Sequence, residues 1–193
     1  MKKRIILAST SPRRKELLSK TGIPFEIIPG DYEEDMTLPM APLELAKHLS
    51  LGKAESVARK EQGVVIGSDT FIVLDDKVLG KPHTPERARE MLTMMRGREH
   101  RVVTGYAVID TETGKIISGV SDNTILFKNF SDEIMDAYIA TGEPLDRAGS
   151  YAIAEGGAQL VEKYEGDYEG IIGLPVRDVV RALQELGVEV SNG

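Results

Sequence analysis

The segment 9–14, which reads STSPRR, places two arginines at what the sequence predicts to be the start of a helix. Cations are unfavourable there by ~0.3–1 kcal/mol each, because the first turn of a helix carries the positive end of the peptide dipole. Free backbone N–H groups, neighbouring hydroxyls and the guanidinium groups of Arg13 and Arg14 together suit a bound phosphate. The hydroxyls belong to Ser9, Thr10 and Ser11. The alternative is that both arginines are solvated and Ser11 only caps the helix. Since the dipole opposes that placement, we favour phosphate binding, although the segment lacks the glycines and the Gly-Lys-Ser/Thr ending of a Walker loop.

Lys53 lies on the apolar side of a second predicted helix, over residues 42–61. Successive helical residues are rotated by about 100°, so Lys53 shares that side with Ala46, Leu49 and Val57. A charge in this place must either extend outward to solvent or find an anion. Gly52 beside it leaves room for another group to approach closely. Taken alone, the position of Lys53 supports extension to solvent at least as strongly as binding of an anion. Considered together with Arg13 and Arg14, it favours binding of an anion.

Three carboxylates are candidates for metal binding or for base catalysis. Asp69 comes just after the apolar run 64–66, and functional side chains gather at strand ends in α/β sheets. Glu33 and Glu34 belong to the acidic stretch 30–36, and Mg²⁺ prefers oxygen ligands and often takes only one or two carboxylates. The alternative for Asp69 is an aspartate that stands in a turn for purely local reasons. The alternative for Glu33 and Glu34 is a solvated acidic loop, which we would favour if no other residue pointed to a site.

Lys81 stands in the segment LGKP, residues 79–82, just beyond a predicted hairpin whose turn is Asp75-Asp76. The hairpin would fold the flanking strands together and bring Lys81 toward Asp69. The alternative is an exposed lysine on a turn. Cations and carboxylates gathered in this way suit phosphate-ester or phosphoanhydride chemistry, in which positioning and charge neutralisation provide most of the catalysis.

An irregular alternation of strands and helices must position these residues. Strands are expected over 4–8, 25–28, both arms of 64–80, 100–110 and 114–127. Helices are expected from Pro12 to just before Gly22, over 42–61, over 85–96 behind Thr84, from Ser131 to about Thr141, and from Pro175 to Gly187. Residues 142–173, rich in glycine, are expected to form loops and short strands. The pattern predicts an α/β protein with a mixed sheet, in a single domain over residues 1–193.

The composition excludes several classes of protein. Hydrophobic residues make up 41% and charged residues 28%, and no apolar run approaches the ~20 residues of a membrane span. The start, MKKRIILAST, turns polar too early for a signal peptide. The chain has no cysteine, which excludes disulfides and thiolate chemistry and is compatible with a reducing cytoplasm. A net charge of −7 argues against binding to nucleic acid or to a membrane surface. The spacing of His48, His83 and His100 is not that of zinc ligands.

At the residues that could carry chemistry, the sequence resembles the Maf family of nucleotide pyrophosphatases, once described as septum-formation inhibitors. The resemblance is carried by LASTSPRRKELL, EED, GKAESVA, GSDTFIVLDDKVLGKP, GEPLDRAGSYAI and GDYEGIIGLP, which span almost the full chain in family order. It implies an α/β fold like that of inosine triphosphate pyrophosphatases, with a cleft between two lobes. It also implies hydrolysis of nucleoside triphosphates to monophosphate and pyrophosphate, with a divalent cation, Mg²⁺ or Mn²⁺, as cofactor.

The resemblance assigns roles to residues of this chain. Asp69 would be the general base that activates water, and Glu34 would assist through the metal, which both carboxylates would bind. The phosphates would be held by Arg13, Arg14, Lys53 and Lys81. Ser9 and Ser11 would line the same turn. A free aspartate has a pKa near ~3.9, so a base role requires a perturbed or metal-assisted setting.

The base preference rests on three positions. Arg13 together with Thr70 resembles the subgroup that acts on dTTP and UTP. That pattern calls for glutamine where this chain has Ala154, and the loss of an amide affects selectivity more than catalysis. Glu155 or Gln159 would be the substitute.

A different class of function stays open: a non-catalytic nucleotide-binding regulator of cell division. The family also makes a homodimer plausible.

Overall fold

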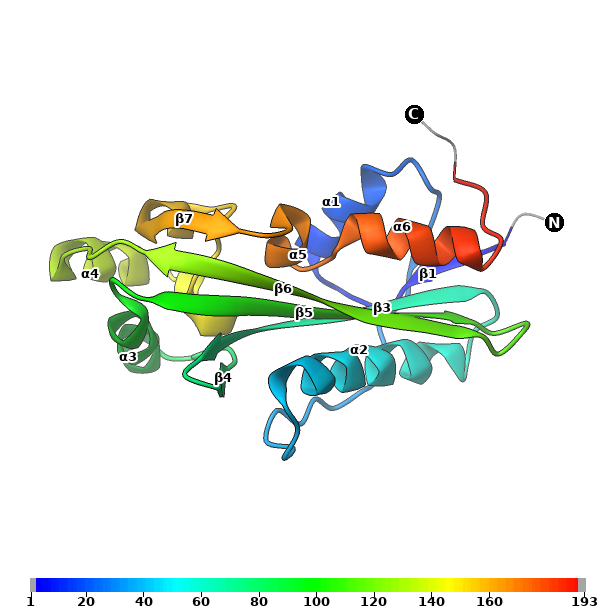
Figure 1. Ribbon diagram of the computed structural model, residues 1–193, viewed down its shortest axis with the longest axis horizontal. Coiled ribbons are helices and arrows are strands. Elements are labelled where there is room, and N and C mark those ends of the chain that lie inside the picture. The colour runs from blue at the N-terminus through cyan, green and yellow to red at the C-terminus, as the bar shows by residue number, and fades with distance from the viewer. Residues whose placement is uncertain (1–2, 191–193) are drawn as a thin grey trace.

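The structure is a computed structural model that describes residues 3–190, and within that range the chain forms one mixed sheet of seven strands (Figure 1). The strands are β1 (Ile5–Leu7), β2 (Glu26–Ile27), β3 (Val64–Leu74), β4 (Lys77–Leu79), β5 (Glu99–Asp110), β6 (Ile116–Phe127) and β7 (Val161–Glu165). Their order is β2-β1-β3-β5-β6-β7, and β4 pairs with the far end of β3. β1 runs parallel to β2 and β3, whereas the other pairs are antiparallel. The predicted α/β class with a mixed sheet is confirmed.

Helices begin where the sequence provides caps. They are α1 (Pro12–Ser19), α2 (Pro42–Ala58), α3 (Pro85–Met95), α4 (Asp132–Ala140), α5 (Tyr168–Ile172) and α6 (Val176–Glu185). The side chains of Ser11, Thr84 and Ser131 each accept a hydrogen bond from the backbone N–H three residues later, as predicted. α2 ends at Ala58, three residues before the predicted end at Glu61. Among the described residues, no helix is long and apolar enough to cross a membrane.

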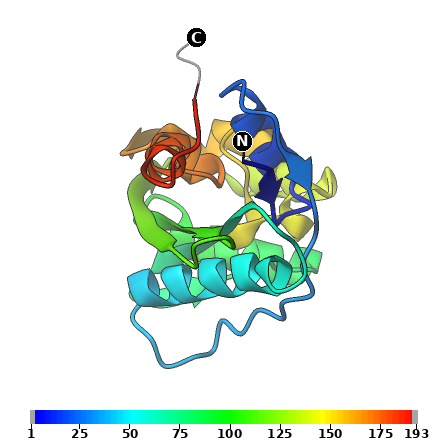
Figure 2. The same ribbon diagram turned by 90° about the vertical axis from the view of Figure 1, so that its right-hand side faces the viewer.

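Two groups of buried side chains divide the molecule along its long axis. α1 and α6 pack on one end of the sheet, and α3 and α4 pack at the other end (Figure 1). The long strands β3, β5 and β6 pass through both groups, and α2 covers the opposite face of the sheet from α6 (Figure 2). The protein therefore has the two lobes that the resemblance implied, joined by continuous strands.

Two glycines allow α2 to lie directly on the sheet. A Cβ at Gly105 of β5 would lie 2.0 Å from the carbonyl oxygen of Ala46, and one at Gly67 of β3 would lie 2.4 Å from that of Ser50. Any larger residue at these positions would push the helix away from the sheet. The consequence is that side chains on the inner side of α2 meet side chains of β3 at short range.

The turn between β3 and β4 is the predicted Asp75-Asp76 hairpin. Both residues have positive φ, 49° and 60°, which is the conformation of the tight turns that suit twisted strands. The turn folds Lys81, just after β4, back toward the middle of β3.

Residues 142–173 hold more helix than the sequence predicted. Besides β7 they contain α5 and three short 3₁₀ helices, Glu143–Asp146, Ala148–Ser150 and Gly156–Leu160. These helices have five residues or fewer, too short for a helical hydrophobic period to be visible in the sequence.

Candidate active site

A cavity of about 770 Å³ lies where the two lobes meet. Segments far apart in the sequence line it: the turn before α1, the acidic loop, α2, β3, the residues after β4, and residues 146–155. The residues to which the resemblance gave a role all line this cavity, namely Ser9, Ser11, Arg13, Arg14, Glu34, Lys53, Asp69, Thr70, Lys81 and Ala154. Glu33 is outside the lining, so of the two acidic-loop glutamates the structure brings Glu34 to the site.

Lys53 joins two of the carboxylates. Its ammonium donates a short hydrogen bond to Asp69 Oδ1 and pairs with Glu34 Oε1 at 2.6 Å. The lysine side chain is 16% exposed, so it does not extend to solvent but finds anions within the protein. Gly52 gives the close approach that the sequence predicted: a Cβ there would lie 2.3 Å from the ring of Tyr32. Tyr32 and Glu34 belong to the same loop, which is thereby fixed against α2.

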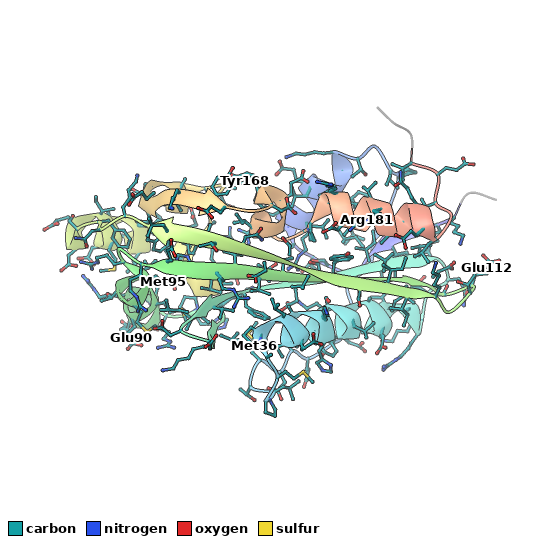
Figure 3. The ribbon with its side chains drawn as sticks, in the orientation of Figure 1. Met36, Glu90, Met95, Glu112, Tyr168 and Arg181 are labelled. Carbon is teal, nitrogen blue, oxygen red and sulfur yellow. The ribbon has the colours of Figure 1, made fainter. Side chains whose placement is uncertain are left out.

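Met36 fixes the other end of that loop. It packs with Leu45 and Leu49 of α2, and Figure 3 shows it below the sheet beside this helix. Its sulfur would lie 3.0 Å from a Cβ at Gly80, the residue before Lys81. The acidic loop is therefore held between α2 and the segment that carries Lys81.

Asp69 is the most deeply buried acidic group of the cavity, with 3% of the residue exposed. Its Oδ2 has no hydrogen-bond partner among the described residues. Burial raises the pKa of Asp69 and the charge of Glu34 adds to this, while Lys53 and Arg14 oppose it. A carboxylate with a raised pKa and one unpartnered oxygen is suited to accept a proton.

Arg14 points into the protein and is bonded to three oxygens. It donates from Nε to the Gly173 carbonyl at 2.8 Å, from Nη2 to Thr70 Oγ1 at 3.1 Å and from Nη1 to Ser9 Oγ at 3.4 Å. Burial lowers the pKa of Arg14, which the charges of Asp69 and Glu34 oppose. The Thr70 hydroxyl also lies 2.9 Å from that of Thr104. In this structure Thr70 therefore positions Arg14 beside Asp69.

Arg13 turns the other way, toward Glu155, a candidate substitute for the amide missing at Ala154, and toward Arg147, which no sequence signal marked. Its Nη1 donates to Glu155 Oε1 at 3.3 Å, and Arg147 donates to the same carboxylate at 3.0 Å. Lys81 donates to Asp146 Oδ1 at 2.6 Å and is half exposed. It lines the cavity that contains Asp69, although its partner in this structure is Asp146.

Asp146 and Arg147 lie in the segment GEPLDRAGSYAI, which carried part of the resemblance, but no local pattern marked them as functional. Tyr151, at the end of the same segment, lines the cavity, and its hydroxyl lies 2.8 Å from Nε2 of His100. Burial lowers the pKa of His100 to about 4, so this histidine is neutral near pH 7. Its contact with Tyr151 is consistent with packing of the cavity wall.

The carboxylates of the cavity fit an ion that needs few protein ligands. Within residues 3–190 there is no group of three or more histidine, cysteine, aspartate or glutamate side chains arranged to hold a metal. Glu34 and Asp69 nevertheless reach the same ammonium group, and Asp69 Oδ2 is unpartnered. This donor set suits Mg²⁺ or Mn²⁺, hard cations that bind through one or two carboxylates and complete their shell with water and phosphate oxygens.

Comparisons with solved structures bear on the fold. The chain is similar to a HAM1 protein from Coxiella burnetii, with a TM-score of 0.55 and 16% identity, over 96% of this chain and 100% of that one. It is similar to the Ham1 protein of Staphylococcus aureus, with a TM-score of 0.54 and 12% identity, over the same shares of the two chains. The predicted fold, like that of inosine triphosphate pyrophosphatases, is confirmed.

Comparisons with curated sequences are closer. A dTTP/UTP pyrophosphatase of Geotalea uraniireducens is 46% identical over 96% of both chains. A protein of the same name from Methanosarcina mazei is 44% identical, over 97% of this chain and 96% of the relative. The model of the family described as Maf-like protein matches residues 4–186 of this chain. This range includes all the residues that line the cavity. This chain is a member of the Maf family.

Proposed function

We propose that the protein hydrolyses nucleoside triphosphates, dTTP and UTP foremost, to the monophosphate and pyrophosphate. The observation that carries the proposal is that Lys53, Lys81, Arg13 and Arg14 line the same cavity as Asp69, a buried carboxylate with one oxygen that has no partner among the described residues. The names of the relatives, dTTP/UTP pyrophosphatases at 46% and 44% identity over nearly the full length, support the same reaction.

The residues divide the work as follows. Asp69 Oδ2 accepts the proton of a water molecule, whose oxygen attacks the α-phosphorus, and the bond from that phosphorus to the bridging oxygen breaks to release pyrophosphate. Burial favours this step because it raises the pKa of Asp69 and makes the carboxylate a better base. Lys53 holds the carboxylate in place through Oδ1 and leaves Oδ2 free. Lys53 and Lys81 neutralise the phosphates as negative charge develops on the leaving group.

A divalent cation belongs to the same proposal. Glu34 and Asp69 would hold it, and it would supply further neutralisation of the triphosphate. Treatment with a chelator should abolish turnover, and Mg²⁺ or Mn²⁺ should restore it. Full activity after exhaustive chelation would refute the metal requirement.

The reaction is tested by its product. The protein is incubated with each of the common ribo- and deoxyribonucleoside triphosphates and with modified pyrimidine triphosphates, and pyrophosphate and orthophosphate are measured separately. The expected result is pyrophosphate and monophosphate in equal amounts, with dTTP and UTP among the best substrates. Orthophosphate as the product would instead indicate a phosphatase. Tight nucleotide binding without turnover would favour the non-catalytic regulator.

The proposal includes three expectations, about the location of the protein, its partners and its oligomeric state. The location is proposed to be the cytoplasm, with which the absence of cysteine is compatible, and fractionation tests it. The net charge of −7 argues against nucleic acid as a partner. A homodimer, expected from the family, is tested by sedimentation equilibrium.

A further inference from the structure

Glu155 occupies a distinctive place in the cavity wall. Its Oε1 accepts hydrogen bonds from Arg13 and from Arg147, both at 3.3 Å, and its Oε2 accepts one from Arg147 at 3.0 Å. All three residues line the cavity, and their side chains are 24–36% exposed. The contacts join residues from two distant parts of the chain at one point that a ligand can reach.

The carboxylate of Glu155 offers hydrogen-bond acceptors, and the guanidinium groups of Arg13 and Arg147 offer hydrogen-bond donors. Burial raises the pKa of Glu155, but the hydrogen bonds and charges of Arg147 and Arg13 outweigh it and hold that pKa below its usual value. The carboxylate is therefore ionised at neutral pH and only accepts hydrogen bonds, whereas the guanidinium groups only donate them. A carboxylate has about four acceptor sites, and the arginines use three of them, so Oε2 retains capacity for a further donor.

Uracil and thymine present the complementary groups. Their N3–H donor stands between two carbonyl acceptors, so a carboxylate can accept from N3–H while a neighbouring guanidinium donates to a carbonyl. Cytosine has an acceptor at N3, which would face the carboxylate without a proton between them. An unmatched polar contact of this kind costs far more than a matched one gains, and it is the basis of strong selectivity.

We propose that Glu155 reads the base, accepting the N3–H of uracil or thymine, and takes over the part of the amide that is absent at Ala154. This inference rests on the proposed function, since it requires a nucleotide in the cavity. Ala154 lines the cavity with a methyl group only. Gln159, the other candidate for the missing amide, is exposed and outside the lining, and its side chain donates to the Gly156 carbonyl at 3.0 Å. Glu155 is thus the candidate that the structure places in the cavity.

The test measures affinity and does not depend on turnover. Non-hydrolysable α,β-imido analogues of UTP, CTP and 3-methyl-UTP are titrated calorimetrically into the wild-type protein and into Glu155→Gln. The wild type should prefer the UTP analogue over the other two by roughly tenfold or more, because only UTP supplies a donor to the carboxylate. In Glu155→Gln the preference over CTP should fall by about tenfold, since an amide offers either a donor or an acceptor.

Glu162→Gln is the matched control. It removes the same charge from an exposed residue of β7 that does not line the cavity, and it should leave all three affinities unchanged. If Glu155→Gln changes the UTP and CTP affinities by one common factor, Glu155 only pairs the arginines and the inference is wrong. Equal affinity of the wild type for UTP and 3-methyl-UTP would overturn it too, without reliance on any variant.

Failure of this inference is distinguishable from failure of the proposed function. Selective binding that depends on Glu155, in a protein that releases no pyrophosphate, would refute the reaction and leave the base-reading role standing. Pyrophosphate release from UTP and CTP, with a preference that Glu155→Gln does not alter, would refute only the role of Glu155.

Discussion

Replacing Asp69 with asparagine should lower activity and raise stability at the same time. The substitution keeps the shape of the side chain, and Lys53 keeps Glu34 as a partner at 2.6 Å. It removes the group that accepts the proton, and general bases typically contribute about 10²–10⁴-fold to the rate, or ~2.7–5.5 kcal/mol of the barrier. We therefore expect kcat for pyrophosphate release to fall by about two to four orders of magnitude.

The effect on stability follows from the raised pKa. Burial raises the pKa of Asp69 in the folded protein above its unfolded value of about 4, so the fold favours the protonated carboxyl. The contribution of Asp69 to stability is fully present below that unfolded value and is lost as the pH rises through the folded-state pKa. Asparagine cannot ionise and escapes this loss. The melting temperature of Asp69→Asn should therefore match the wild type near pH 4 and exceed it once the pH has risen through the folded-state pKa of Asp69.

The assay combines pyrophosphate release with thermal unfolding from pH 4 to pH 8. Asp76→Asn is the control, because Asp76 is exposed, lies outside the cavity and has a positive φ that asparagine tolerates. Activity within tenfold of the wild type would refute the role of Asp69 as base. A variant that is less stable than the wild type at pH 8 would refute the reasoning from burial.

Three further substitutions test other parts of the cavity. Lys53→Met removes a cation that lowers the pKa of Asp69, so the acidic limb of the kcat–pH profile should move to higher pH and the KM for triphosphate should rise. An unchanged pH profile would show that Lys53 does not influence the pKa of Asp69. Arg13→Ala should lower kcat/KM for UTP more than for CTP, because Arg13 contacts Glu155; an equal loss for both would assign Arg13 to the phosphates. Gly105→Ala places a Cβ 2.0 Å from the Ala46 carbonyl oxygen, and should reduce the free energy of unfolding in urea by about 1–3 kcal/mol; an unchanged denaturation midpoint would show that α2 adjusts freely.

Local signals predicted most of the fold. The N-caps at Ser11, Thr84 and Ser131 and the Asp75-Asp76 turn each rest on interactions within a few residues, and the structure has them all. Residues 142–173 were the weak part of the prediction. Their short helices pack against elements outside the segment: Glu143–Asp146 against α3 and α4, Ala148–Ser150 against α3 and β3, and α5 against β5 and β6. No pattern within the segment reveals these contacts.

The site was predictable as a set of residue types but not as a set of contacts. A lysine among apolar neighbours left two alternatives, extension to solvent or an anion partner, and only the nearby arginines favoured the anion. In the structure Lys53 pairs with two carboxylates of the protein, Glu34 and Asp69, which the sequence could not specify. Asp146 and Arg147 carry no signal of their own. They pair with Lys81 and Glu155 only because the chain returns to the cavity after α4.

The residues that bring Lys53 and Asp69 together carry no chemistry themselves. Lys53 reaches Asp69 because α2 lies against β3 and β5, and that approach requires Gly67 and Gly105. Gly105 pairs with Asp69 across the two strands, so a displaced helix would move Lys53 away from the carboxylate it orients. A search for acids, bases and cations finds the groups that react but not the glycines on which their geometry depends. Selection on the activity of this site should therefore act on both glycines as well as on Asp69, even though neither has a side chain that takes part in the reaction.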